Sequence, residues 1–69
     1  MEKVNIGFDI GSVSINTVIC NKNGELIEEL PYRRHFGKTV DLCSELLQDI
    51  ENRYGKENID RVAFTGTHG

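Results

Sequence analysis

Apolar residues alternate with polar residues or glycine at the start of the chain, which predicts a β-strand over residues 4–10. Residues 14–21, SINTVICN, are rich in β-branched side chains and predict a second strand. Gly11 interrupts the alternation, so residues 11–13 are predicted to be the tight connection of a hairpin.

A third strand is predicted over residues 25–34, ELIEELPYRR. It follows a turn at Asn23-Gly24, two residues that suit positive φ. Pairing near Pro31 is expected to be irregular, because proline has no amide hydrogen to donate. The three strands are therefore expected to form an antiparallel meander.

The hydrophobic period changes to that of a helix from Thr39 to Tyr54. Thr39 is the expected N-cap, Gly55 is the expected stop, and Asp49 is expected to pair with Arg53 one turn later. The predicted apolar stripe, which would pack on the sheet, consists of Val40, Cys43, Leu46, Leu47, Ile50 and Tyr54.

A short strand over residues 62–64 completes the order βββαβ. The helix supplies the crossover that a parallel pairing requires. We therefore expect an α/β fold with a mixed sheet: a three-stranded antiparallel meander, one helix and one further parallel strand. The 69 residues form one unit, and the glycine-punctuated loop over residues 65–69 is expected to lead into the rest of a longer chain.

Charge and composition narrow the class of protein. The formal net charge of -3 argues against nucleic-acid binding, and Arg33, Arg34 and His35 are interpreted as a solvated strand end. Cys20 and Cys43 lie in apolar segments and are interpreted as reduced core thiols, as in a cytoplasmic protein. The sequence has no signal-peptide pattern and no run of about 18 apolar residues, so we expect neither secretion nor membrane insertion.

The predicted hairpin carries more polar chemistry than a turn needs. Gly11 allows a ligand to approach the backbone, and Ser12 and Ser14 offer amides and hydroxyls that suit phosphate oxygens. Asp9 beside them could attract Mg²⁺ through retained water. The alternative is an ordinary hairpin in which the Asp and Ser side chains only satisfy turn amides.

The stretch GFDIGSVSIN resembles the first phosphate motif of the superfamily of actin, sugar kinases and heat-shock chaperone ATPases. That superfamily has a ribonuclease-H-like βββαβ fold, built twice around a nucleotide cleft. With NKNGELI, RRHFGKTV and VAFTGTHG, the chain is most similar to the activator ATPases of 2-hydroxyacyl-CoA dehydratases and benzoyl-CoA reductases. The resemblance implies that residues 1–69 are the N-terminal part of the first lobe of an actin-like ATPase domain.

The resemblance also implies roles for matching positions. Asp9 would be the catalytic residue that organises Mg²⁺ through water, and Gly11 and Ser12 would hold the phosphates of ATP or ADP. Three further residues would line the same turn: Val13, Ser14 and Asn16. Thr65, Gly66 and Gly69 match a later TG-x-G-like loop of the family only loosely, and Thr65 and Gly66 would contact phosphate or the other half of the cleft. His35 matches a family histidine, with a satisfied surface or loop histidine as the alternative.

Activators of this kind couple ATP hydrolysis to electron transfer from a [4Fe-4S] cluster, held between two copies of the activator, into a CoA-ester dehydratase or reductase. The cluster ligands lie later in the family's chain, so Cys20 and Cys43 are not assigned to it. The 69 residues alone are not expected to hydrolyse ATP, because the opposing phosphate loop and the adenosine pocket come from other segments. A sugar or small-acid kinase of the same fold and a non-catalytic interaction module are the alternatives.

Overall fold

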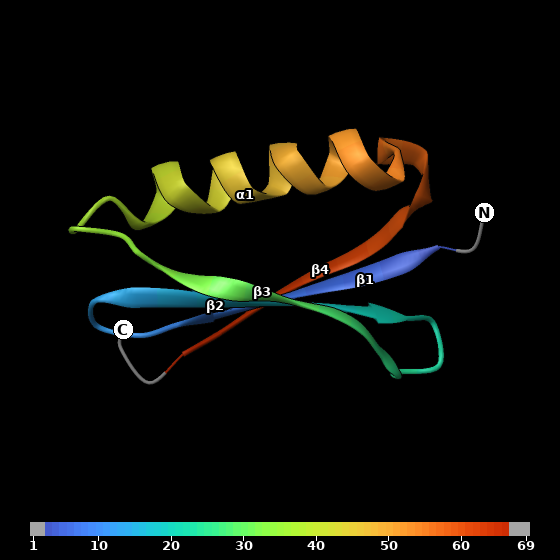
Figure 1. Ribbon diagram of the computed structural model, residues 1–69, viewed down its shortest axis with the longest axis horizontal. Coiled ribbons are helices and arrows are strands. Elements are labelled where there is room, and N and C mark those ends of the chain that lie inside the picture. The colour runs from blue at the N-terminus through green and yellow to red at the C-terminus, as the bar shows by residue number, and fades with distance from the viewer. Residues whose placement is uncertain (1–2, 67–69) are drawn as a thin grey trace.

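A computed structural model describes residues 3–66 and places one long helix over one face of a four-stranded sheet (Figure 1). The elements in chain order are β1 (Val4–Ile10), β2 (Ser14–Asn21), β3 (Leu26–Arg34), α1 (Thr39–Tyr54), the 3-10 helix η1 (Lys56–Asn58) and β4 (Ile59–Gly66). The predicted order βββαβ is confirmed. The structure adds η1 and a last strand longer than the predicted residues 62–64.

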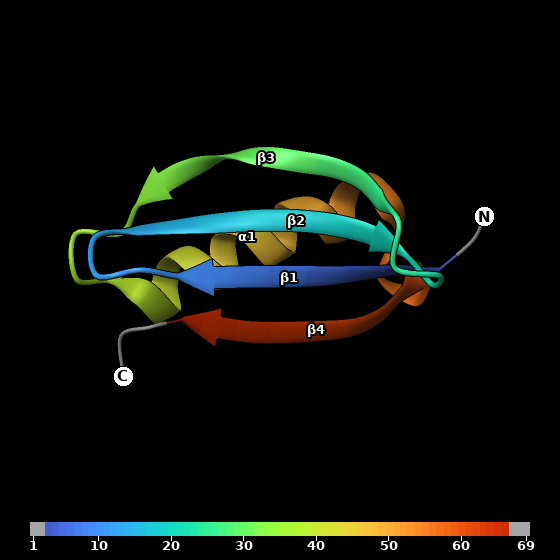
Figure 2. The ribbon, with the colours of Figure 1, turned by 90° about the horizontal axis from the view of Figure 1, so that it is seen from below.

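The sheet has the strand order β3-β2-β1-β4 (Figure 2). The pairs β1·β2 and β2·β3 are antiparallel, and β1·β4 is parallel. The chain is therefore a small α/β domain with a mixed sheet, as predicted. Because α1 covers only one face, the other face of the sheet, seen in front in Figure 2, is left open.

The pairing of β3 with β2 is irregular where proline predicted it. Ile15 pairs with Arg33 and Thr17 with Leu30, so Pro31 lies inside a bulge of β3. The turn before β3 contains a positive φ at Gly24 but not at Asn23, so the expectation of positive φ was correct only for the glycine. The Asn23 amide instead donates to the Asn21 side chain, which fixes the turn without a left-handed residue there.

The core lies between α1 and the covered face of the sheet. Its buried residues are Val4, Ile6, Phe8, Ile15, Ile19, Leu42, Cys43, Leu46 and Ile50. The predicted stripe was wrong at one end, because Val40 is 77% exposed and Leu42 is buried in its place. At about 100° per residue, Val40 lies about 100° around the helix from the centre of the buried positions. The rotation of α1 on the sheet therefore excludes it.

The ends of α1 differ in how they are held. The N-cap is Lys38 rather than the predicted Thr39, and no side chain caps the helix there. The predicted stop at Gly55 is confirmed: its φ is 92°, in the left-handed region, and its amide donates to the Glu51 carbonyl at 2.8 Å.

Arg53 forms its ion pair with Glu28 and not with the predicted Asp49, whose charge acts on the guanidinium without an ion pair. Its Nη2 donates to both carboxylate oxygens of Glu28 on β3, at 2.7 and 2.9 Å, and the Tyr54 hydroxyl donates to the same carboxylate at 3.0 Å. The Arg53 guanidinium, followed by the Tyr54 hydroxyl, lowers the pKa of Glu28. A charged group on the sheet thus competes successfully with the neighbour one turn away, and it ties the end of α1 to β3.

The two cysteines are both free. Cys43 is buried on the side of α1 that faces the sheet. Burial raises the pKa of its thiol, which agrees with a core role. Cys20 is half-buried on β2. Over residues 3–66, no helix is long and apolar enough to cross a membrane.

Candidate functional site

Three polar residues form a row across the open face of the sheet. Asp9 on β1 pairs with Asn16 on β2 and with Thr65 on β4. Paired residues project to the same face, and the neighbours Phe8 and Phe64 project to the covered face, where their rings stack 5.4 Å apart. Asp9 therefore lies in the middle of the row, with an amide on one side and a hydroxyl on the other.

The Asp9 side chain is exposed, and within residues 3–66 no hydrogen bond or ion pair engages its carboxylate. Asn16 and Thr65 are exposed as well. Because no described residue pairs with this carboxylate, its charge is available to a cation. No group of three or more potential metal-ligating residues exists in the described part of the chain, so Asp9 would have to share a metal with water and the ligand.

The β1–β2 turn presents two amides for which the described residues offer no acceptor, those of Ser12 and Val13. The Gly11 amide is different, because it donates to the Ser14 carbonyl at 2.8 Å and closes the turn. An incoming anion would therefore meet the Ser12 and Val13 amides rather than that of Gly11. This divides the predicted roles, since Gly11 offers space and Ser12 offers the donor.

The two predicted glycines at the site have different reasons to be glycine. Gly11 has no positive φ, and an added Cβ would lie 3.4 Å from the Ser14 carbonyl oxygen, an ordinary contact. The fold does not need glycine there, which agrees with close approach of a ligand. An added Cβ on Gly66 would collide with the Ile10 carbonyl oxygen. Packing of β4 against β1 alone therefore accounts for Gly66, and its identity is not evidence for ligand contact.

His35 is only 7% exposed, although it was interpreted as part of a solvated strand end. Its Nε2 lies 3.0 Å from the Gly11 carbonyl oxygen, and its backbone amide donates to the Val13 carbonyl at 3.0 Å. The alternative of a satisfied surface or loop histidine is wrong about the surface, because the ring is buried, but both ring nitrogens have hydrogen-bond partners. One of those partners is the predicted phosphate turn. The sequence signal was weak, since only the position of His35 just after a strand distinguished it.

The two arginines of this basic segment are exposed, as expected. Arg33 lies 3.7 Å from the Glu45 carboxylate on α1, and the Arg34 guanidinium stacks over the Phe36 ring with 5.9 Å to its centre. Ser12, Val13 and residues 34–37 line a small hollow of about 150 Å³ between the hairpin turn and the β3–α1 loop. The basic segment thus lies beside the turn rather than apart from it.

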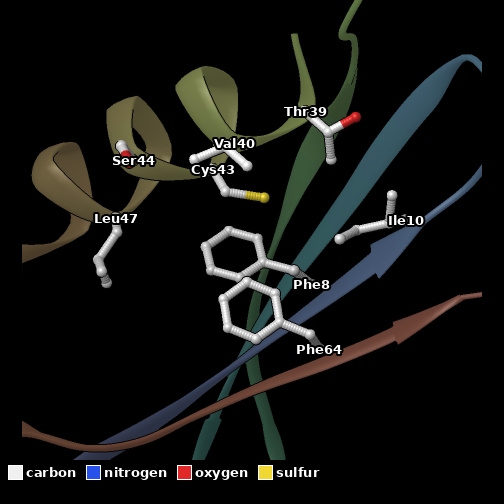
Figure 3. Close-up of a pocket in the computed structure, with 8 residues that line it drawn as sticks. All are labelled: Phe8, Ile10, Thr39, Val40, Cys43, Ser44, Leu47 and Phe64. Carbon is white, nitrogen blue, oxygen red and sulfur yellow. The ribbon is translucent and has the colours of Figure 1, made fainter. Parts of the chain in front are cut away.

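An apolar pocket of about 260 Å³ lies on the covered face, between α1 and β4 (Figure 3). Eight residues line it: Phe8, Ile10, Thr39, Val40, Cys43, Ser44, Leu47 and Phe64. Its walls are almost entirely apolar, and it lies across the sheet from Asp9. It therefore offers no partner to a phosphate, and it is separate from the polar row.

The end of the predicted loop over residues 65–69 and the two cysteines are not part of the polar row or of the turn beside it. Gly69, the last residue of the loosely matching loop, lies outside the described residues, as do Thr67 and His68. Cys20 and Cys43 do not come together, because β2 alternation places Cys20 on the open face while Cys43 packs on the covered face. They do not fit a shared iron–sulfur cluster.

No protein-family model, curated protein or solved structure gives a significant match to this chain. The polar row and the turn beside it are therefore the features of this chain that point to a function.

Proposed function

We propose that the β1–β2 hairpin binds the phosphate groups of a nucleotide together with Mg²⁺. The observation that carries the proposal is the unpaired Asp9 carboxylate beside a turn with two unengaged amides, at Ser12 and Val13. Val13 and Ser14 complete the lining of the turn, and Asn16 and Thr65 flank Asp9.

The site contains both a negative carboxylate and amides that attract anions, which is why the proposal includes Mg²⁺ as well as phosphate. Backbone amides attract an anion, whereas a carboxylate beside them repels one. The two features are compatible when a divalent cation lies between the carboxylate and the phosphates. When bound, Mg²⁺ would neutralise phosphate charge, and Asp9 would hold it through water while the Ser12 and Val13 amides orient the phosphate oxygens.

We further propose that the chain is part of the first lobe of a ribonuclease-H-like ATPase domain. The βββαβ order and the hairpin motif support this assignment. The parent would be an activator that uses ATP to drive an electron into a CoA-ester dehydratase or reductase, and it would act with a second copy of itself. Its [4Fe-4S] cluster would need ligands outside the described residues, because Cys20 and Cys43 lie on opposite faces of the sheet.

Titration of the ¹⁵N-labelled 69-residue protein with Mg·ATP tests the proposal. We expect amide shifts at residues 11–14, with a dissociation constant on the order of 1 mM, since one lobe offers few contacts. Asp9→Asn should weaken Mg·ATP binding about tenfold, because the cation loses its anionic partner. With the metal chelated, the same substitution should leave ATP binding equal or stronger, because it removes a repulsion.

Asp60→Asn is the matched control, since Asp60 is an exposed aspartate on β4 at the opposite end of the sheet. It should leave binding unchanged. Shifts that cluster away from residues 9–16, or an affinity for Mg·ATP that Asp9→Asn leaves unaltered, would refute nucleotide binding at this hairpin and favour an interaction module. A sugar or small-acid kinase would share this hairpin and would be separated from an activator by the acceptor substrate it phosphorylates.

A further inference from the structure

His35 links two segments of the chain that are far apart in sequence, the β1–β2 turn and the β3–α1 loop. The two segments lie side by side at one end of the sheet in both views (Figures 1 and 2). The ring and the backbone amide of His35 bond to the carbonyls of Gly11 and Val13, which flank Ser12 on either side. The turn is therefore held at two points around the residue whose amide faces a ligand in the proposed function.

The hydrogen bonds of the ring fix its protonation form. The Gly37 amide donates to Nδ1 at 3.0 Å, so Nδ1 must be an acceptor and carry no hydrogen. A neutral imidazole with a bare Nδ1 carries its hydrogen on Nε2. Nε2–H therefore donates to the Gly11 carbonyl at 3.0 Å. The ring acts as a bridge that accepts from its own loop and donates to the turn.

The loop around His35 holds the ring in this orientation. The Lys38 amide donates to the His35 carbonyl at 2.7 Å, which closes a tight turn. Its central residues, Phe36 and Gly37, have φ values of 52° and 81°, as in a type I′ turn. A left-handed conformation at a phenylalanine is unfavourable by itself. In this loop, the left-handed conformation of Phe36 places the Gly37 amide within hydrogen-bond distance of the His35 ring.

The bond to Gly11 also determines where the Ser12 amide points. All described peptide bonds are trans, and in a trans peptide the C=O and the following N–H point in opposite directions. The Gly11 carbonyl points at the His35 ring, so the Ser12 N–H points away from it. Without this bond, the Gly11 amide and the Ser14 carbonyl would still close the turn, but the Gly11 carbonyl and the Ser12 amide would lose the contact that holds their direction.

We propose that His35 is a positioning residue that sets the direction of the Ser12 amide toward the phosphate ligand. This inference rests on the proposed function for its ligand, but not for its geometry. His35 itself lies on the far side of the Gly11–Ser12 peptide and does not touch the phosphate. The β3–α1 loop thereby becomes part of the nucleotide site without supplying a contact to the ligand.

Two substitutions separate the two halves of the bridge. His35→Gln places an amide nitrogen near the position of Nε2, so it keeps a donor for Gly11 and loses the acceptor for Gly37. His35→Asn places an oxygen near the position of Nδ1, so it keeps the acceptor and loses the donor. Both leave the backbone bond to Val13 in place, and both make a buried residue smaller or more flexible.

The experiment measures binding of Mg·ATP to both variants and to the wild type by ¹⁵N amide titration, together with stability in urea. We expect His35→Asn to weaken binding roughly fivefold, the factor for one ordinary hydrogen bond, and to lower the shift of the Ser12 amide on binding. His35→Gln should bind within about twofold of the wild type. A role in folding alone would instead make affinity follow stability in both variants.

A ligand-free measurement keeps this inference separate from the proposed function. Long-range ¹⁵N–¹H spectra of the wild type should show His35 as the neutral form with hydrogen on Nε2. The other tautomer, or equal affinity of His35→Asn and wild type, would overturn the positioning role while nucleotide binding stands. A wild type that shows this tautomer and fails to bind Mg·ATP would overturn the proposed function and, with it, the role of His35 toward a ligand.

Discussion

Alanine at each of two glycines, Gly11 and Gly66, tests whether folding or a ligand requires glycine at the site. The two residues lie at the same end of the sheet, one after β1 and the other at the end of β4. An added methyl group on Gly66 would collide with the Ile10 carbonyl, whereas one on Gly11 would lie 3.4 Å from the Ser14 carbonyl. The same methyl group would therefore clash with the backbone at residue 66 but make an ordinary van der Waals contact at residue 11.

The expected magnitudes differ clearly. Gly66→Ala must push β4 away from β1, and overpacking of this kind lowers the free energy of unfolding by about 1–3 kcal/mol. A 69-residue domain has about 3–10 kcal/mol in total, so this loss is a large fraction. Gly11→Ala should be neutral or stabilise by up to about 1 kcal/mol, because alanine restricts the unfolded chain without straining the native turn.

Urea unfolding followed by circular dichroism measures both changes. The midpoint of Gly66→Ala should fall, and that of Gly11→Ala should stay or rise, with equal slopes. The Mg·ATP titration should then show the reverse order: Gly11→Ala should weaken binding in a fully folded protein, because its methyl group occupies the space that a phosphate needs.

Two results would contradict a role of Gly11 in ligand binding. If Gly11→Ala destabilised the protein as much as Gly66→Ala, the turn itself would require glycine. If it bound Mg·ATP as well as the wild type, glycine there would not mark close approach of a ligand. Either result would remove Gly11 from the case for a phosphate site.

Two further predictions concern stability. The Arg53 guanidinium holds the pKa of Glu28 below its ordinary value of 4.5, so the contribution of Glu28 is complete above that pH and is lost as the pH falls through the folded-state pKa. The free energy of unfolding in urea should therefore fall less for Glu28→Gln than for the wild type when the pH is lowered from about 6 to about 3. Equal falls in both proteins would contradict this coupling. Ile50→Ala should lower the free energy of unfolding by about 2–5 kcal/mol, since Ile50 is fully buried, whereas Val40→Ala should change it by less than about 0.5 kcal/mol. Similar losses from both in thermal and urea unfolding would place Val40 in the core after all.

The elements of this protein follow from short-range patterns in its sequence. Alternation over β1, β-branched residues over β2 and a helical period over α1 predict these elements with their observed bounds. Glycine at 11 and 55 and proline at 31 mark the turn, the helix stop and the bulge. These signals are local, because backbone conformation and side-chain direction repeat over two to four residues.

The site depends on contacts that no local pattern contains. Asp9 and Gly11 were identifiable because they lie two residues apart, but only strand register places Thr65 beside Asp9. The chain has no short-range signal that His35 bonds to Gly11, which is 24 residues away. For the same reason the helical period predicted a stripe but not which edge of it would be buried. Register, helix rotation and cross-loop hydrogen bonds are set by packing between distant segments, and that is the part the tertiary structure decided.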